Sequence, residues 1–192
     1  MRGDSGFIQA EGDRGPWMQT HSGLHVHLCD PTPREIRLLD IAHALSRLAR
    51  FNGHTYGPHP YSVAQHCVWV AEELPKEYAL WGLLHDAHEA YIGDITTPVA
   101  LALTADSGHN RSVVFDLKRR VQRAIHEKFA LPWPLPLEAA ARIHGADQDA
   151  LDFERRLLLD GAYTGMALPP DEAKKLFLQV FWWSGGYGRA WA

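Results

Sequence analysis

Apolar and polar positions alternate with a period of two only near the start of the chain. Residues 24–28 read LHVHL, a pattern typical of a strand with one buried face, and the turn residues HSG at 21–23 separate them from residues 17–20. The Asp30-Pro31 pair ends the second arm, because proline cannot continue a strand ladder. We therefore expect a short β-hairpin over residues 17–28, with both histidines turned toward solvent.

Farther along the chain, apolar positions recur every three to four residues, which predicts helices. Capping boxes that begin at Thr32 and Ser62 indicate where two of these helices start. Glycine and proline residues at 53–60 exclude a helix there. The expected helices cover residues 32–50, 62–74, 76–91, 112–129, 137–159 and 171–182, with a short apolar segment at 99–103. This pattern predicts an all-α fold of about six or seven helices with an N-terminal hairpin.

Length and composition favour a single domain. A chain of 192 residues, 46 % of them hydrophobic, needs neither a disulfide nor a metal ion merely to fold. The glycine-rich residues 1–16 are expected to form a loose N-terminal segment, residues 17–183 the domain, and residues 184–192 a glycine-rich tail.

Charge and cysteine content narrow the classes of partner. The net charge is −4, from 19 Lys and Arg against 23 Asp and Glu, which argues against a nucleic-acid polymer or an anionic membrane surface. Cys29 and Cys67 are too few for a disulfide framework, and no apolar run is long enough to span a membrane. We therefore expect a cytoplasmic protein. The 12 histidines direct attention to metal binding, because histidine is the commonest metal ligand.

The densest polar cluster lies at residues 83–91, within a predicted apolar helix. His85 and Asp86 can each supply one ligand to a metal ion, and Glu89 lies on the same side of a helix, four residues after His85. The alternative is a hydrogen-bonded His85–Asp86 pair that only completes the packing of this helix. His88 turns away from the cluster and is not expected to be a ligand.

Two residues on other helices favour the metal site. His66 is flanked by valines, and Asp147 shares an apolar stripe with Ile143 and Ala150, so both should face the core. A buried carboxylate requires a partner. The resulting set is His66, His85, Asp86 and Asp147. Such a nitrogen and oxygen set leaves coordination positions open for water, and it suits Mn, Fe, Co, Ni or Zn, with Mg a weaker candidate.

The order of these four residues resembles that of the HD-domain metal-dependent phosphohydrolases. Several stretches are similar to the small bacterial and phage branch related to 5'-deoxynucleotidases and dATP triphosphohydrolases. They read DIAHAL at 40–45, RFNGH at 50–54, YSVAQH at 61–66, LHDAHEAY at 84–91 and GDITTP at 93–98. The resemblance extends over residues 24–159 and implies a single HD-domain helical bundle.

The resemblance also implies roles for individual residues. The metal ligands would be His66, His85, Asp86 and Asp147. Glu89 would orient or deprotonate the attacking water, Asp94 would lie beside the substrate, and Arg50 would hold a phosphate, with Phe51 able to stack on a base or ribose. From the residues alone, Arg50 is also compatible with a helix-end cation, Asp94 with an N-cap, and Phe51 with a core aromatic.

The implied activity is hydrolysis of a phosphate ester or anhydride in a (deoxy)nucleotide, by a dATP-type triphosphohydrolase or a closely related 5'-deoxynucleotidase. The sequence does not separate these two substrates. A nucleotide-binding or regulatory module with a structural metal and no turnover is the alternative, and a helical interaction scaffold without metal is a third. The resemblance further implies a homo-oligomer in the cytoplasm of a bacterial cell or phage-infected host.

Overall fold

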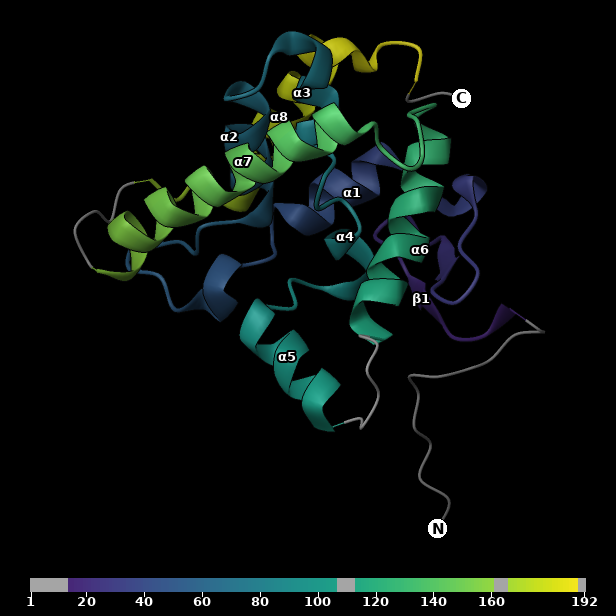
Figure 1. Cartoon of the computed structure of the whole chain (residues 1–192), viewed down its shortest axis with the longest axis horizontal. Coiled ribbons are helices and arrows are strands. Elements are labelled where there is room, and N and C mark those ends of the chain that lie inside the picture. Colours follow the sequence, from purple (N-terminus) through teal and green to yellow (C-terminus); the bar gives the residue numbers. More distant parts are fainter. Residues whose placement is uncertain (1–13, 107–112, 161–165, 190–192) are drawn as a thin grey trace.

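A computed structural model describes residues 14–106, 113–160 and 166–189, which are mostly helical (Figure 1). The helices are α1 Leu38–Leu45, α2 Val63–Glu72, α3 Lys76–Leu83, α4 Glu89–Ile92, α5 Thr97–Asp106, α6 Val113–Lys128, α7 Leu137–Glu154 and α8 Pro170–Phe181. The predominantly helical prediction is therefore confirmed. The predicted loose segment at residues 1–16 and the tail at residues 184–192 lie partly outside the described residues.

The predicted hairpin is present as β1 (Trp17–Gln19) paired antiparallel with β2 (His25–His27). Val26 of β2 is fully buried, so the alternating pattern correctly identified the inner face. His25 is exposed and stacks on Trp17, with ring centroids 3.7 Å apart. The expectation for His27 is wrong: it is half-buried, because its Nδ1 lies 2.7 Å from the carboxylate of Glu35.

The predicted helix over residues 32–50 is wrong in its extent. A short 3-10 turn at Pro33–Glu35 precedes α1, and a second one at Arg50–Gly53 follows it. Between the first turn and α1 the backbone is extended at Ile36 and Arg37, and the Ile36 side chain is fully buried. At the second turn Phe51 has a φ of 53°, a left-handed conformation that few non-glycine residues adopt.

Glu35 links the N-terminal hairpin to the helices through hydrogen bonds. Its carboxylate accepts hydrogen bonds from the Thr32 N–H at 2.9 Å and from Arg14 Nη1 and Nη2 at 2.9 and 3.1 Å, in addition to the His27 contact. Burial raises the pKa of Glu35, but these donors outweigh burial and hold the pKa below its usual value. The ionised form of Glu35 is therefore favoured in the folded protein.

We expect Glu35→Gln to lower the free energy of unfolding by about 1 kcal/mol at neutral pH. Because the pKa of Glu35 is lower in the folded than in the unfolded chain (about 4.3), its stabilisation is complete above about pH 5 and is lost as the pH falls through the folded-state pKa. Urea unfolding at pH 7 and pH 3 measures this, with exposed Glu73→Gln as the control. A deficit of equal size at both pH values would contradict the prediction.

Helix α2 lies at the centre of the bundle and packs against α3, α7 and α8, while α1 packs against α4 and α8. Nearly all side chains of α2 are buried, His66 completely. Helix α5 stands out from the body (Figure 1) and exposes Val99, Leu101 and Leu103. Within the described ranges, no helix is both long and apolar enough to cross a membrane.

Candidate metal centre

The continuous helix predicted over residues 76–91 is interrupted at the polar cluster. Helix α3 ends at Leu83, turns follow over residues 84–88, and α4 begins at Glu89. In a straight helix the neighbouring His85 and Asp86 would point about 100° apart. The break allows both side chains to turn toward the same point, so the expectation that they lie within a regular helix is wrong.

Gln122 of α6 supports this break. Its Nε2 donates to the Leu84 carbonyl oxygen at 2.7 Å, and its Oε1 accepts from the His88 backbone N–H at 3.2 Å. The Gln122 side chain is buried and bridges the His88 N–H and the Leu84 carbonyl, which would pair directly in a regular helix; that carbonyl also accepts the Ala87 N–H at 3.1 Å. The same Oε1 also lies 3.1 Å from His88 Nδ1, which therefore carries a proton.

The four predicted ligands come together between α2, the turn and α7. His66 Nε2 lies 3.1 Å from Asp147 Oδ1 and 3.7 Å from Asp86 Oδ2. His85 Nε2 lies 3.2 Å from Asp86 Oδ2 and 3.7 Å from Asp147 Oδ1. Atoms bonded at about 2.1 Å to a shared ion lie about 3.0 Å apart in an octahedron and about 3.4 Å apart in a tetrahedron. The spacing therefore fits one ion, and we call these four residues the candidate metal centre.

Two imidazole nitrogens at this centre lack hydrogen-bond partners among the described residues. These are His66 Nε2 and His85 Nε2, both buried. His85 Nδ1 lies 2.7 Å from the Gly82 carbonyl oxygen and His66 Nδ1 lies 2.8 Å from Glu154 Oε1, so each Nδ1 is a donor and each Nε2 is left as a ligand atom. A buried polar atom without a partner is costly, and a divalent cation would satisfy both nitrogens.

Without a metal ion, the charges at the centre stabilise one another. Burial would lower the pKa of His85, but the neighbouring Asp86 outweighs burial and raises it well above its usual value. Burial would likewise raise the pKa values of Asp86 and Asp147, yet the imidazoles beside them hold both below their usual range. Ionised carboxylates are therefore available as hard oxygen ligands for a cation.

Glu89 lies next to the centre, in the first turn of α4, and is 3 % exposed. Burial, followed by the charges of Asp86 and Asp94, raises the pKa of Glu89 to about 9. Its Oε1 lies 3.4 Å from Lys118 Nζ, whereas Oε2 is buried without a hydrogen-bond partner among the residues described. The buried surroundings and the neighbouring carboxylates therefore make Glu89 hold a proton more tightly than an exposed glutamate does.

His88 is buried beside Glu89, and burial lowers its pKa to about 4. Ligand atoms lie within 4.8 Å of one another in two groups, His66 with His85 and Asp147, and Asp86 with His88 and Glu89, so Asp86 lies between the four-residue centre and Glu89. The ammonium group of Lys118 beside Glu89 opposes a second cation at this point. The exclusion of His88 as a ligand stays a prediction.

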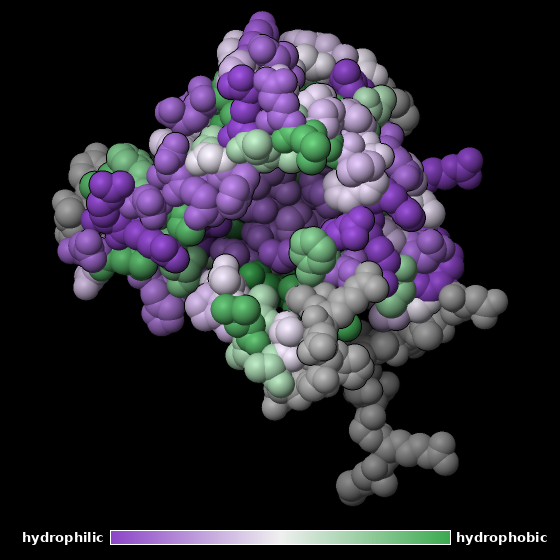
Figure 2. Space-filling model, in the orientation of Figure 1, coloured by the Kyte–Doolittle hydropathy of each residue, from purple (hydrophilic) through white to green (hydrophobic). Residues whose placement is uncertain are grey.

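A cleft of about 630 Å³ adjoins the centre, a volume typical of small-molecule sites. Figure 2 shows hydrophilic residues gathered in a hollow near the middle of the molecule's face. All four residues predicted to act on the substrate line the cleft, namely Arg50, Phe51, Glu89 and Asp94. The other lining residues include apolar ones (Ile95, Pro98, Val99, Leu151 and Leu159), cationic ones (Lys118 and Arg155) and polar or acidic ones (Asn52, His54, Asp86, Thr96, Thr97, Asp147 and Gln148). The cleft thus combines acidic, basic and apolar surfaces.

Asp94 and Phe51, which are predicted to contact the substrate, are both only partly buried. Burial raises the pKa of Asp94, which is half-buried. Phe51 is half-buried too, and the guanidinium carbon of Arg50 lies 5.5 Å from its ring centroid. Both residues retain access to the cleft.

The sequence analysis missed Glu154 at the end of α7. Arg50 Nε and Nη2 donate to its Oε2 at 3.1 and 2.8 Å, while its Oε1 contacts His66. Burial would lower the pKa of Arg50, but Glu154 raises it above its usual value. Glu154 follows Asp147 by seven residues, two helical turns, and this spacing could have placed it on the same face. Its polar neighbours in sequence concealed that signal.

No family model matches the chain. An uncharacterized protein of Rhodobacter capsulatus is 38 % identical over 138 residues, which cover 68 % of this chain and 67 % of that protein. The chain belongs to the family of this protein. The uncharacterized protein YfdR of Escherichia coli is 37 % identical to the chain over 119 residues, which cover 60 % of each protein. Neither relative's name states an activity.

Proposed function

We propose that the protein is an HD-domain phosphohydrolase that uses a divalent metal ion to act on (deoxy)nucleotides. The observation that carries this proposal is the convergence of two imidazole nitrogens and two carboxylates, at distances suited to one ion, beside a cleft of nucleotide size. The donor set fits Mn, Fe, Co, Ni or Zn, with Mg a weaker candidate. Bound there, the ion would activate water and withdraw charge from a phosphoryl oxygen.

Glu89 would serve as the base. Without metal its pKa is raised by burial and by the carboxylates nearby, but beside a dication its carboxyl group would ionise. Its unpartnered Oε2 could then hold the proton of the attacking water. A site that is purely structural has no use for such a group, and this favours an enzyme over a regulatory module with a structural metal.

Arg50, Asp94 and Phe51 would bind the substrate. Two N–H groups of Arg50 are committed to Glu154, which leaves three to donate to phosphate oxygens in the cleft. Asp94 would lie beside the substrate, and the ring of Phe51 would be available to a base or ribose. Lys118 and Arg155 add positive charge that suits a mono- or a triphosphate.

The partner would be a small-molecule nucleotide and no nucleic-acid polymer, in a cytoplasmic homo-oligomer. Exposed apolar side chains on α5 and Trp183 after α8 support self-association. Sedimentation of the purified protein measures the oligomeric state.

The test is incubation of the purified protein with mono- and triphosphate nucleotides and Mn²⁺, Co²⁺ or Mg²⁺, followed by chromatography of the products. We expect turnover that requires metal and is lost with a chelator. Tripolyphosphate would identify a triphosphohydrolase, and orthophosphate from monophosphates would identify a 5'-deoxynucleotidase. A protein that holds metal tightly and hydrolyses none of these nucleotides would instead be the regulatory module, and one without metal would be a scaffold.

A further inference from the structure

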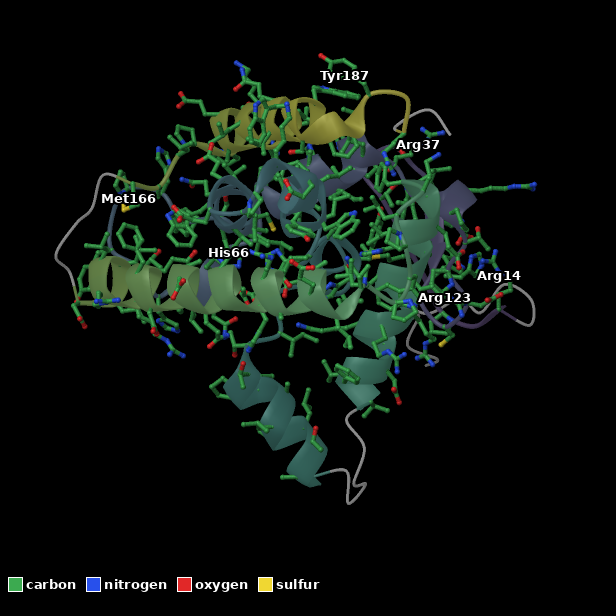
Figure 3. All side chains as sticks on the ribbon, turned by 45° about the horizontal axis from the view of Figure 1, so that its top comes forward. Arg14, Arg37, His66, Arg123, Met166 and Tyr187 are labelled. Carbon is green, nitrogen blue, oxygen red and sulfur yellow. The ribbon has the colours of Figure 1, made fainter. Side chains whose placement is uncertain are left out.

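One carboxylate, that of Glu154, joins the substrate cleft to the metal centre. Its Oε1 lies 2.8 Å from His66 Nδ1, and its Oε2 accepts two hydrogen bonds from Arg50. Glu154 is 2 % exposed, His66 is 0 % exposed and Arg50 is 8 % exposed, so the contacts that Glu154 makes are largely shielded from water. Figure 3 shows His66 close to α7, the helix that ends at Glu154.

On the metal side, Glu154 determines how His66 presents its ring. A carboxylate acts only as an acceptor, so Nδ1 donates to Glu154, and Nε2 faces Asp86 and Asp147, where it would bind a metal ion. Carboxylate contacts of this kind orient metal-binding histidines and raise the basicity of the ligand nitrogen.

On the cleft side, Glu154 determines how Arg50 presents its guanidinium group. The Nε and Nη2 edge is held by Oε2, which leaves Nη1 and one Nη2 hydrogen for a ligand in the cleft. The negative charge of Glu154 also offsets the positive charge of Arg50. Arg50 is buried, and it lies close to the residues that would bind the metal ion. Without Glu154, Arg50 would lose its orientation and would repel a metal ion.

We propose that Glu154 is a positioning residue that sets the affinity of this site for metal and for phosphate together, through His66 and Arg50. The inference rests on the proposed function only for the identity of the anion. A single side chain that touches neither the metal ion nor the phosphate would then control the binding of both.

The experiment compares Glu154→Gln with the natural protein by calorimetry, using Mn²⁺ alone and then inorganic phosphate added to the Mn²⁺-loaded protein. Glutamine has one acceptor oxygen, so it can satisfy His66 or Arg50 but not both. We expect Mn²⁺ affinity to fall about 10- to 100-fold, and phosphate affinity to fall with it.

Glu138→Gln is the matched control, because Glu138 lies on the same helix, is exposed and pairs with Arg142 at 3.1 Å. We expect it to bind both ligands as the natural protein does. Arg50→Gln tests the phosphate contact separately from the metal contact: it should lose phosphate affinity while Mn²⁺ affinity does not fall, because the His66 contact persists and a nearby positive charge is removed.

Natural Mn²⁺ affinity in folded Glu154→Gln, with only the melting temperature lowered, would show a merely structural residue and overturn the proposal. If Glu154→Gln does not fold, Glu154→Asp is the second variant, because it keeps the charge but is one methylene too short to reach both partners. Natural affinities for Mn²⁺ and phosphate in Glu154→Asp would also overturn the proposal. Neither titration requires turnover. Failure of this inference is therefore distinguishable from failure of the proposed phosphohydrolase activity.

Discussion

Replacing His85 with alanine should give a folded protein that no longer retains a metal ion and has no phosphohydrolase activity. The change removes one of the two imidazole nitrogens that converge on Asp86 and Asp147. Loss of a residue that only supports a ligand costs about 10- to 100-fold in affinity, so loss of the ligand itself should cost more than about 100-fold. Elemental analysis after desalting, together with the melting temperature of the metal-free protein, measures the effect.

His144→Ala is the matched control for this experiment. His144 is an exposed histidine on α7, the helix that carries Asp147, and its removal should change neither metal content nor activity. Full metal content in His85→Ala would contradict the four-residue centre. The metal would then have to be sought at another group, such as that of Asp86, His88 and Glu89.

Glu89→Gln should keep the metal ion and lose about 10²- to 10⁴-fold in kcat. Glutamine preserves the size of the side chain, but its amide cannot take a proton from water. Since Glu89 is not one of the four converging ligands, metal content should match that of the natural protein. Steady-state kinetics at saturating Mn²⁺, with metal content measured on the same samples, provides the test.

The control for Glu89→Gln is Glu127→Gln, which changes an exposed carboxylate on α6 that pairs with Arg123. This variant should have natural kcat. If Glu89→Gln retained its metal and kept kcat within a few fold of the natural value, Glu89 could not be the base. Loss of metal in Glu89→Gln would instead make it a ligand.

Patterns of neighbouring residues in the sequence correctly predicted the start of α2 and the buried face of β2. The Ser62 hydroxyl accepts the Gln65 N–H at 3.3 Å, as its capping box predicts, and α2 begins at the next residue. The buried Val26 follows the alternation that predicted β2. The spacing of apolar residues also predicted that His66 and Asp147 lie together, because the apolar faces of neighbouring helices meet in the core.

The break between α3 and α4 could not be predicted in this way. Leu83, Leu84, Ala87 and Ala90 continue a helical apolar pattern, and no proline or glycine lies between them. The partner that stabilises the turn is Gln122, which is 38 residues away from Leu84. Glu154 escaped prediction for a similar reason, since its partners lie 88 and 104 residues earlier in the chain.

The role of Gln122 has a consequence for protein design. Transplanting the HDAHE segment into a continuous helix of another bundle would not reproduce the metal geometry, because the host helix would remain regular. The graft would also need an amide side chain from a neighbouring helix, placed to donate to one backbone carbonyl and accept from an N–H four residues later. The turn and the helix that carries this amide would have to be transferred together, and His66 and Asp147 from two further helices would still be needed to complete the metal centre.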